Sequence, residues 1–554
     1  MGFLSNLRNR LGEKSTDTSP SLDRQNEKKS ASAPSPDAIG DEYISDEAVG
    51  EAVQDDLHRG MKPRQLNMMA IAGAIGTGLI LGTINALKFG PAPLLIGYII
   101  MGFTVYIVMV ALGEMGAWLP HKKSFSGYAT RFVDPAFGFA TGWNYFFKYV
   151  IVLPNNLTAT GILIQYWLPN INVSVWVTVF GIAIILLNLI HVRFFGEAEF
   201  WMSLVKALVI LMLIFMCLAI SLGAGPNGFR SGFWYWTDPG AFGPYNATLS
   251  GDKTVTLIEG STGRFLGVWA CLVQATFAYL GTELVGVAFG ETPNPRKNVP
   301  RAVNQTLGRI VFFYIAGVLV LGMAVPYNDK FLLEALNSKV KLAGFASPFV
   351  IAARKAGITK LDSAVNGLLM VFTISAANSD IYLASRTVWA LANDGQAPKI
   401  MRRTNLRGVP IPAVALSSLF CALGYMNAKK DSQTVFGYFV SLVTVFGALN
   451  WISVLVSYLA MCRGMKAQNI PRSEMPYRNP LLPWGAYIAL AITMLVIVFS
   501  GYNAFIPRFQ LDKFMTSYIG IVVYLFNILV WKFVKKTKRV KAEDMDLQTD
   551  RRIF

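Results

Sequence analysis

Charged residues are scarce in this chain of 554 residues, at 15% of the total. Soluble proteins carry about a quarter charged residues, so a fully solvated surface is excluded. Cysteine and histidine are also few, at four and three. No Cys, His and carboxylate cluster has ligand spacing, so we expect no metal, no organic cofactor and no enzymatic activity. The four cysteines lie in separate apolar runs and are expected to be small buried side chains.

Long apolar runs are what the chain has in place of charge, and 53% of its residues are hydrophobic. The runs recur at close to the roughly 20 residues that a helix needs to cross a bilayer. They predict an all-α membrane protein with twelve spans, near 67–87, 92–117, 136–166, 174–192, 201–223, 264–290, 306–326, 364–391, 409–427, 435–462, 484–504 and 514–534. The net charge of +17 belongs largely to loops beside these spans and does not indicate nucleic acid.

The polar ends of the chain flank the membrane part. Residues 1–60 are rich in Ser, Asp, Glu, Lys and Pro, which predicts a disordered tail before a transporter domain at 61–536. Residues 537–554 form a second tail. Lys and Arg are most frequent in the loops that would be inside if the N-terminus were inside, so both termini are expected to be cytoplasmic.

Two loops on the expected outer side carry further signals. Asn246-Ala-Thr248 is a glycosylation acceptor, although this short motif is common by chance. The loop at 327–363 contains the apolar stretch Ala346–Ala353, which predicts a short amphipathic helix over the outer mouth.

Glycines cluster in the middle of the first and sixth spans. The first has Gly73, Gly76 and Gly78, and the sixth has Gly281 and Gly286. Close helix packing would explain either cluster alone. Paired clusters at corresponding positions of two five-helix halves instead indicate interrupted helices around a transporter site. Freed N–H groups there suit a carboxylate and freed carbonyls suit an ammonium, so the pair of breaks matches an α-amino acid.

The motifs resemble those of the fungal amino-acid permeases, in the amino acid–polyamine–organocation superfamily. They include Gly73-Ala-Ile-Gly-Thr-Gly78, Phe277-Ala-Tyr-Leu-Gly-Thr-Glu283 and Gly395-Gln-Ala-Pro398, within a resemblance over about residues 60–540. Pro154-Asn-Asn-Leu-Thr158 and Thr434-Val-Phe-Gly-Tyr-Phe439 look like the dicarboxylic amino-acid permeases, which import glutamate and aspartate with protons across the plasma membrane. The resemblance implies a leucine-transporter-type fold, with two inverted five-helix repeats and two additional helices.

The resemblance also implies roles for residues at the two helix breaks. Gly76, Thr77 and Gly78 would present N–H groups to the substrate α-carboxylate. Carbonyls near Ile71–Gly73 and near Phe277, Ala278 and Tyr279 would take the α-ammonium, at the break that continues to Gly281. The ring of Phe277 would cover the substrate from outside.

Ionisable residues inside the spans are costly and are therefore functional candidates. Lys206 matches the fifth-helix lysine of proton-coupled relatives, although a lysine near a span end can also extend its ammonium to the interface. Glu283 follows the break in the sixth span and is expected to serve structure and proton coupling. Glu114 lies near an inner end, where an ion pair at a loop or gate is the better interpretation.

The third span carries the signal for substrate charge. Lys148 stands where neutral amino-acid permeases of this family usually have an uncharged residue, and Asn156 stands where they often have Glu. The two are eight residues apart and therefore share a helix face. A cation at Lys148 suits an anionic substrate side chain. The alternative is that Lys148 pairs with Asp380 or another acid away from the site.

The sequence therefore predicts a proton-coupled plasma-membrane importer of glutamate and aspartate. A broad-specificity general amino-acid permease and an amino-acid-sensing receptor of the same fold are the alternatives. The expected partners are the amino acid, protons and the lipid bilayer, with a ubiquitin ligase possible at Lys14, Lys28 and Lys29 of the N-terminal tail.

Overall fold

A computed structural model of the protein describes residues 76–120, 124–190, 192–226, 228–248, 255–287, 295–336, 347–429 and 431–549. All of these belong to one compact unit, Gln54–Phe554. The predicted N-terminal tail with Lys14, Lys28 and Lys29 lies outside the described residues, and so do Ile71 and Gly73, where a break in the first span was predicted.

Ten helical segments within the described residues are long and apolar enough to cross a membrane. They are α3 (Pro91–Trp118), α5 (Pro135–Ile164), α6 (Val173–Ile190), α7 (Val192–Ser221), the continuous run of α10 (Pro295–Arg309), η5 (Ile310–Ala316) and α11 (Gly317–Ala324), α14 (Leu361–Asn393), α15 (Ile411–Leu419) with η7 (Phe420–Ala428), α16 (Ser432–Ala467), α17 (Trp484–Phe499) with η9 (Tyr502–Ala504), and α18 (Leu511–Lys535).

Two further helical segments take the places of the predicted first and sixth spans. The described part of the first runs through η2 (Gly78–Gly82) into α2 (Thr83–Leu87). The sixth is α8 (Gly260–Tyr279), followed after a break by the short α9 (Leu284–Val287). Gly281 lies in that break with a φ of 97°, which confirms the predicted interruption. Together with the ten longer segments, these two match the positions of the twelve predicted spans.

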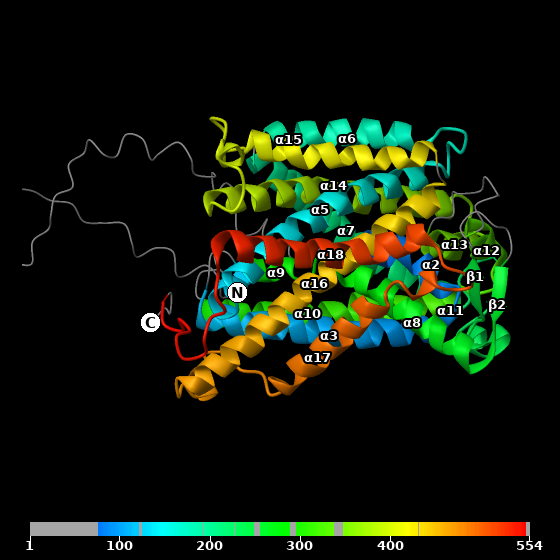
Figure 1. The fold of residues 1–554 in the computed structure, drawn as a ribbon. Helices are drawn as coiled ribbons and strands as arrows, with labels where there is room; N and C mark the ends of the chain where they lie inside the picture. Colours follow the sequence, from blue (N-terminus) through cyan, green and yellow to red (C-terminus); the bar gives the residue numbers. More distant parts are fainter. Residues whose placement is uncertain are drawn as a thin grey trace, which may run out of the picture. The chain divides into compact units, whose positions relative to one another are not determined.

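Helix α5 organises the packing because apolar and small residues cover its whole circumference. It is buried along most of its length, between α14 and α16, with α6 and α18 on further sides. Figure 1 shows α14, α5 and α7 on one side of the bundle and α3 with α17 on the other. Helix α18 differs from α5 in presenting a long row of exposed apolar side chains such as Val522, Phe526 and Phe533, as expected for a lipid-facing helix.

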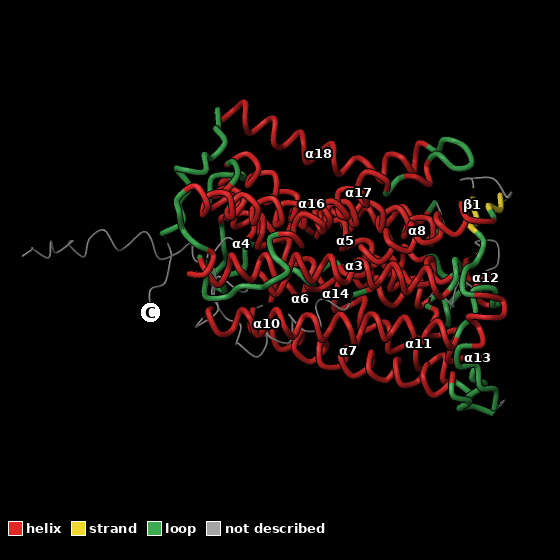
Figure 2. The backbone as a smooth tube through the Cα atoms, turned by 90° about the horizontal axis from the view of Figure 1, so that it is seen from below, coloured by secondary structure: helices red, strands yellow, loops and turns green. Residues whose placement is uncertain are grey.

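One end of the bundle carries β1 (Tyr245–Thr248), antiparallel to β2 (Val255–Ile258), and the short helices α12 (Lys330–Leu336) and α13 (Pro348–Lys355) (Figures 1 and 2). The predicted short helix at 346–353 is therefore confirmed as α13. Ser347 caps it and donates a 2.8 Å hydrogen bond to the Ile80 carbonyl of η2. Asn246 lies in β1 opposite Leu257, and its glycosylation stays a prediction.

At the other end, the C-terminal segment folds back onto α4 (Ser124–Phe132) and the end of α16. Val540 N–H donates to the Val133 carbonyl at 2.9 Å, and Gln468 donates to the carbonyls of residues 542, 543 and 545. Met545 and Leu547 are buried there. A Cβ on Gly464 would lie 2.4 Å from Met545 Sδ, so a larger residue there would displace the Met545 side chain. The sequence predicted a tail at 537–554 but not this packing.

Asp134 connects the same end of the bundle to helix α5. Its side chain caps α5 by accepting from Ala136 N–H at 2.8 Å, and it also accepts from Thr537 at 2.9 Å and Lys532 at 3.1 Å. Burial opposes ionisation of Asp134, but these donors together hold the pKa of its carboxyl below the usual value.

Candidate functional site

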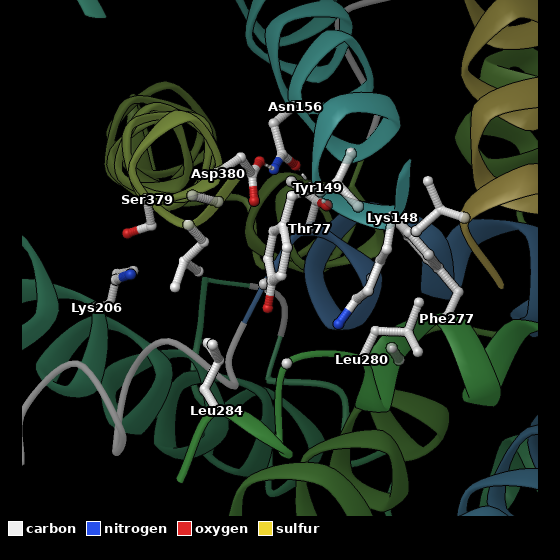
Figure 3. Close-up of a pocket in the computed structure, with 18 residues that line it drawn as sticks. Thr77, Lys148, Tyr149, Asn156, Lys206, Phe277, Leu280, Leu284, Ser379 and Asp380 are labelled. Atoms are coloured by element: carbon white, nitrogen blue, oxygen red, sulfur yellow. Dashed lines mark hydrogen bonds between the residues drawn. The ribbon is translucent and has the colours of Figure 1, made fainter. Parts of the chain in front are cut away.

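A cavity of about 70 Å³ lies where the described start of the first span and the break in the sixth span meet α5, α7 and α14. Figure 3 shows its polar side chains entering from several of these elements. The lining residues are Gly76, Thr77, Gly78, Lys148, Tyr149, Val152, Asn156, Lys206, Phe277, Ala278, Leu280, Gly281, Leu284, Ala376, Ser379, Asp380, Leu383 and Val443.

The first and sixth spans touch through their backbones at this cavity. A Cβ on Gly78 would lie 2.5 Å from the Cα of Ala278, so the approach requires glycine. Helix α8 ends at Tyr279, Leu280 is extended, and Gly281 takes its positive φ. The glycines thus allow close contact between the described start of the first span and the interrupted sixth span, as expected for a transporter site.

Most of the predicted binding residues line this cavity. They are Gly76, Thr77, Gly78, Lys148, Asn156, Phe277, Ala278 and Gly281. Tyr279 lies away from it, fully buried, with its hydroxyl donating to the Tyr98 carbonyl at 2.9 Å. Phe277 packs edge-on against Phe436 of α16 and is 5% exposed. Ile71 and Gly73 are outside the described residues.

Lys148 is ion-paired with Glu283, and both side chains are almost fully buried. Glu283 also accepts from Gly281 N–H at 3.1 Å and from the Trp451 indole at 3.4 Å. Tyr149 places its ring 4.8 Å from the Lys148 ammonium. The pair therefore joins the scaffold helix α5 to the break in the sixth span. Lys148 thus lines the cavity and pairs with Glu283 rather than with Asp380, and its contact with an acidic substrate stays a prediction.

Lys206 is also buried and paired, which excludes its extension to the interface. Its ammonium lies 3.4 Å from Glu199 on the same helix, α7. Glu199 accepts two contacts from the Ser375 hydroxyl of α14, at 2.9 and 3.1 Å, and one from Ser203 at 3.3 Å. Our sequence reasoning missed Glu199, because it began the fifth span at residue 201. The signal available was a glutamate seven residues, or two turns, before the buried lysine.

Asp380 of α14 ends a chain of hydrogen bonds that crosses the cavity wall. Thr77 Oγ1 donates to Asn156 Oδ1 at 3.0 Å, and Asn156 Nδ2 donates to Asp380 Oδ2 at 2.7 Å. Both bonds are drawn as dashed lines in Figure 3. The chain links the first break, α5 and α14, and it explains the presence of Asn156 at a cavity-facing position.

Glu114 lies apart from the cavity in α3. Arg472, which precedes α17, reaches its carboxylate at 2.8 and 2.9 Å, and the Tyr458 hydroxyl donates at 2.6 Å. This confirms the interpretation of Glu114 as half of an ion pair at an end of the bundle.

Comparison with known proteins identifies the class of this membrane protein. The profile of the amino acid permease family matches residues 65–543, and the chain belongs to this family of multi-pass membrane transporters. It is 50% identical to an uncharacterized amino-acid permease of Schizosaccharomyces pombe, over 89% of this chain and 92% of that protein. It is 42% identical to the dicarboxylic amino acid permease of Saccharomyces cerevisiae, over 95% of this chain and 85% of that protein.

Other relatives that match along most of the chain are named for proline or lysine. Among solved structures, a manganese transporter of Eremococcus coleocola superposes with a TM-score of 0.51 at 13% identity, over 87% of this chain and 98% of that one. This likeness shows the leucine-transporter-type fold and nothing about the substrate.

Proposed function

We propose that the protein is a proton-coupled importer of amino acids at the plasma membrane, with glutamate and aspartate as preferred substrates. The observation that supports an acidic substrate most directly is a lysine, Lys148, in the wall of the cavity between the two helix breaks. The likeness to a dicarboxylic amino acid permease supports the same assignment.

In this proposal the substrate backbone binds to the two breaks. The N–H groups of Gly76, Thr77 and Gly78 hold the α-carboxylate, because N–H groups at a helix start attract anions. Carbonyls near residues 71–73 and at 277–279 hold the α-ammonium. Lys148 exchanges Glu283 for the side-chain carboxylate of the substrate, which forms a charge-assisted hydrogen bond.

Transport follows when the two broken helices rock against the scaffold. Lys206 and Glu283 are the proposed coupling residues, since each belongs to a buried ion pair at the cavity. A change of protonation in either pair leaves an unbalanced buried charge, and such a charge is costly enough to favour a different packing.

The test is uptake of labelled glutamate by cells that lack their own acidic amino-acid uptake. Uptake should rise as external pH falls and should not respond to replacement of sodium. Competition by unlabelled amino acids separates the alternatives. Equal competition by neutral and acidic amino acids would make the protein a general permease, and binding without flux would make it a receptor.

The termini belong to the same proposal. Both are placed in the cytoplasm, where Lys14, Lys28 and Lys29 of the N-terminal tail are open to a ubiquitin ligase. Deleting residues 1–40 should leave uptake intact and slow nutrient-triggered endocytosis. Normal endocytosis of the truncated protein would contradict the role of the tail.

A further inference from the structure

The ionisable groups of the cavity do not balance. Two ammonium groups, Lys148 and Lys206, are each bound to a glutamate, Glu283 and Glu199. Asp380 is a third carboxylate, 5% exposed, and no cation among the described residues forms an ion pair with it. When all five groups are ionised, two cations face three anions, and the site has a formal charge of −1.

An acidic amino acid also has a net charge of −1, since it carries two carboxylates and one ammonium. Bringing it beside an ionised Asp380 places two uncompensated negative charges in a small, largely dry space, which is unfavourable. A proton on Asp380 removes one of them. We propose that Asp380 takes up the proton that accompanies an acidic substrate. This proposal rests on the proposed function and adds Asp380 to its coupling residues, as the carboxylate that binds the proton.

The charged groups on the helices that pack against α14 support this assignment. Helix α5 contributes Lys148 and the neutral phenol of Tyr149, and α7 contributes Lys206 and Glu199. Figure 3 shows the two ammonium groups on opposite sides of the cavity. Each of these two ammonium groups forms its ion pair with a glutamate, so neither forms one with Asp380.

The remaining neighbours of α14 supply no cation for Asp380 either. Helices α6 and α15 contain no ionisable side chain. Arg354, from α13, binds Asp362 at 3.1 Å, eighteen residues before Asp380 on α14. Arg386, on α14 itself, stacks on the Tyr382 ring at 3.4 Å. Lys399 and Arg402 belong to η6 (Lys399–Arg402), beyond the far end of α14.

The hydrogen-bond chain offers a route from this proton to the substrate. In the structure Asn156 donates to Asp380 and Thr77 donates to Asn156. A proton on Asp380 Oδ2 makes that atom a donor, so Asn156 turns its carbonyl toward it and its NH₂ toward Thr77. The Thr77 hydroxyl then accepts from Asn156, and its own proton becomes free to reach the substrate carboxylate. The proton enters from the outer solution and leaves to the inner one with the substrate.

The experiment measures proton uptake on binding, using purified full-length protein and glutamate. Titration calorimetry in buffers of different ionisation enthalpy gives the number of protons bound with each glutamate. In the pH range in which Asp380 is ionised before binding, wild type should take up about one proton with each glutamate. In that range its affinity for glutamate should fall about tenfold for each unit by which the pH rises. Asp380→Asn should take up almost no protons on binding, and its affinity for glutamate should be the same across that pH range.

Asp380→Asn is close in shape to aspartate, and its amide can still hydrogen-bond to Asn156, so it should fold. Asp380→Glu keeps the carboxylate and should restore proton uptake. Asp362→Asn is the matched control, because it makes the same change on the same helix at a carboxylate outside the cavity, and it should behave as wild type. A fluorescence-detected melting curve checks that each variant is folded.

Three results would overturn the proposal. One is wild-type proton uptake in Asp380→Asn. Another is loss of alanine and glutamate binding together in a folded Asp380→Asn, which would assign Asp380 to the substrate ammonium instead. The third is loss of glutamate binding alone, since removing the charge should favour an anion. Absence of glutamate binding in wild type would refute the proposed function itself.

Discussion

The two buried lysine–glutamate pairs of the cavity differ in what they connect. Lys148 and Glu283 lie 135 residues apart and join α5 to the break after α8. Lys206 and Glu199 lie on one helix, and among the described residues the hydrogen bonds that tie this pair to another helix come from the Ser375 hydroxyl of α14. When the broken helix moves against α5, the Lys148–Glu283 pair must therefore either separate or move with it. The second pair makes no hydrogen bond to the broken helix within the described residues, and its bonds to another helix go to α14.

Lys206→Ala is expected to have the largest effect, because it leaves Glu199 buried without a cation. Breaking a buried pair in this way costs about 3–5 kcal/mol of stability. In proteoliposomes, accumulation of glutamate driven by a pH gradient should be lost, while glutamate exchange without a gradient should persist. The double variant Lys206→Ala, Glu199→Gln should melt closer to wild type. Gradient-driven accumulation by the single variant would show that this pair has no part in coupling.

Lys148→Gln should act on substrate choice. Losing one partly desolvated contact with the distal carboxylate costs on the order of 2–3 kcal/mol, or about a hundredfold in glutamate affinity. Alanine never makes that contact and should lose far less. The measurement is competitive uptake of labelled glutamate and alanine at one pH.

Glu283 complicates that experiment, because Lys148→Gln also strands a buried carboxylate. The double variant Lys148→Gln, Glu283→Gln removes both charges. It should recover alanine uptake and stability while remaining weak for glutamate. An equal fall for both substrates in the double variant would assign Lys148 to folding or coupling and end the specificity argument.

Ser375→Ala tests how the second pair is tied to α14. The hydroxyl donates to a charged carboxylate, and such bonds contribute about 1.5–3 kcal/mol. Ser203→Ala is the matched control, since its bond to the same carboxylate is longer, at 3.3 Å, and stays within α7. Thermal unfolding should show a larger loss for Ser375→Ala. The reverse order would mean that Glu199 depends on its own helix.

The smallest effect is expected for an ion pair outside the membrane part. Arg131 meets Asp546 of the C-terminal segment at 2.9 Å, with Asp546 47% exposed. Exposed pairs contribute about 0–1 kcal/mol, so Asp546→Asn should hardly change the melting temperature. It should instead speed proteolytic trimming of the C-terminus, with Asp544→Asn as the control for a lost exposed charge.

The same contact has a defined pH dependence. Burial opposes ionisation of Asp546, but the Thr549 and Gln548 N–H groups and Arg131 hold the pKa of its carboxyl at about 2. Because this value lies below the unfolded one, the contribution is present above pH of about 4 and is lost as pH falls toward 2. Docking of the C-terminus should therefore weaken in that acidic window and not above it.

The spans and the break in the sixth span could be predicted because they depend on local chemistry. Apolar length gives the helices, and Gly78 and Gly281 mark where a backbone must approach or turn. The pairing of Lys148 with Glu283 could not, since it depends on which helices meet in space. Glu199 was missed for a more local reason. By hydropathy, a glutamate near the end of a span is assigned to a loop. In the structure Ser375 and Lys206 bind the carboxylate of Glu199 and so stabilise it inside α7.

The C-terminal segment also places a condition on any protein that recognises it. Residues 540–547 bind the body of the transporter through Val133, Gln468 and the Gly464 surface. A partner that binds this stretch in extended form can bind only the fraction of molecules whose C-terminal segment is undocked. Its apparent dissociation constant is therefore the intrinsic one divided by that fraction. Each 1.4 kcal/mol of docking free energy weakens such a partner about tenfold. Any change that loosens its contacts with α4 or with the end of α16 would thus expose the C-terminal segment to such a partner.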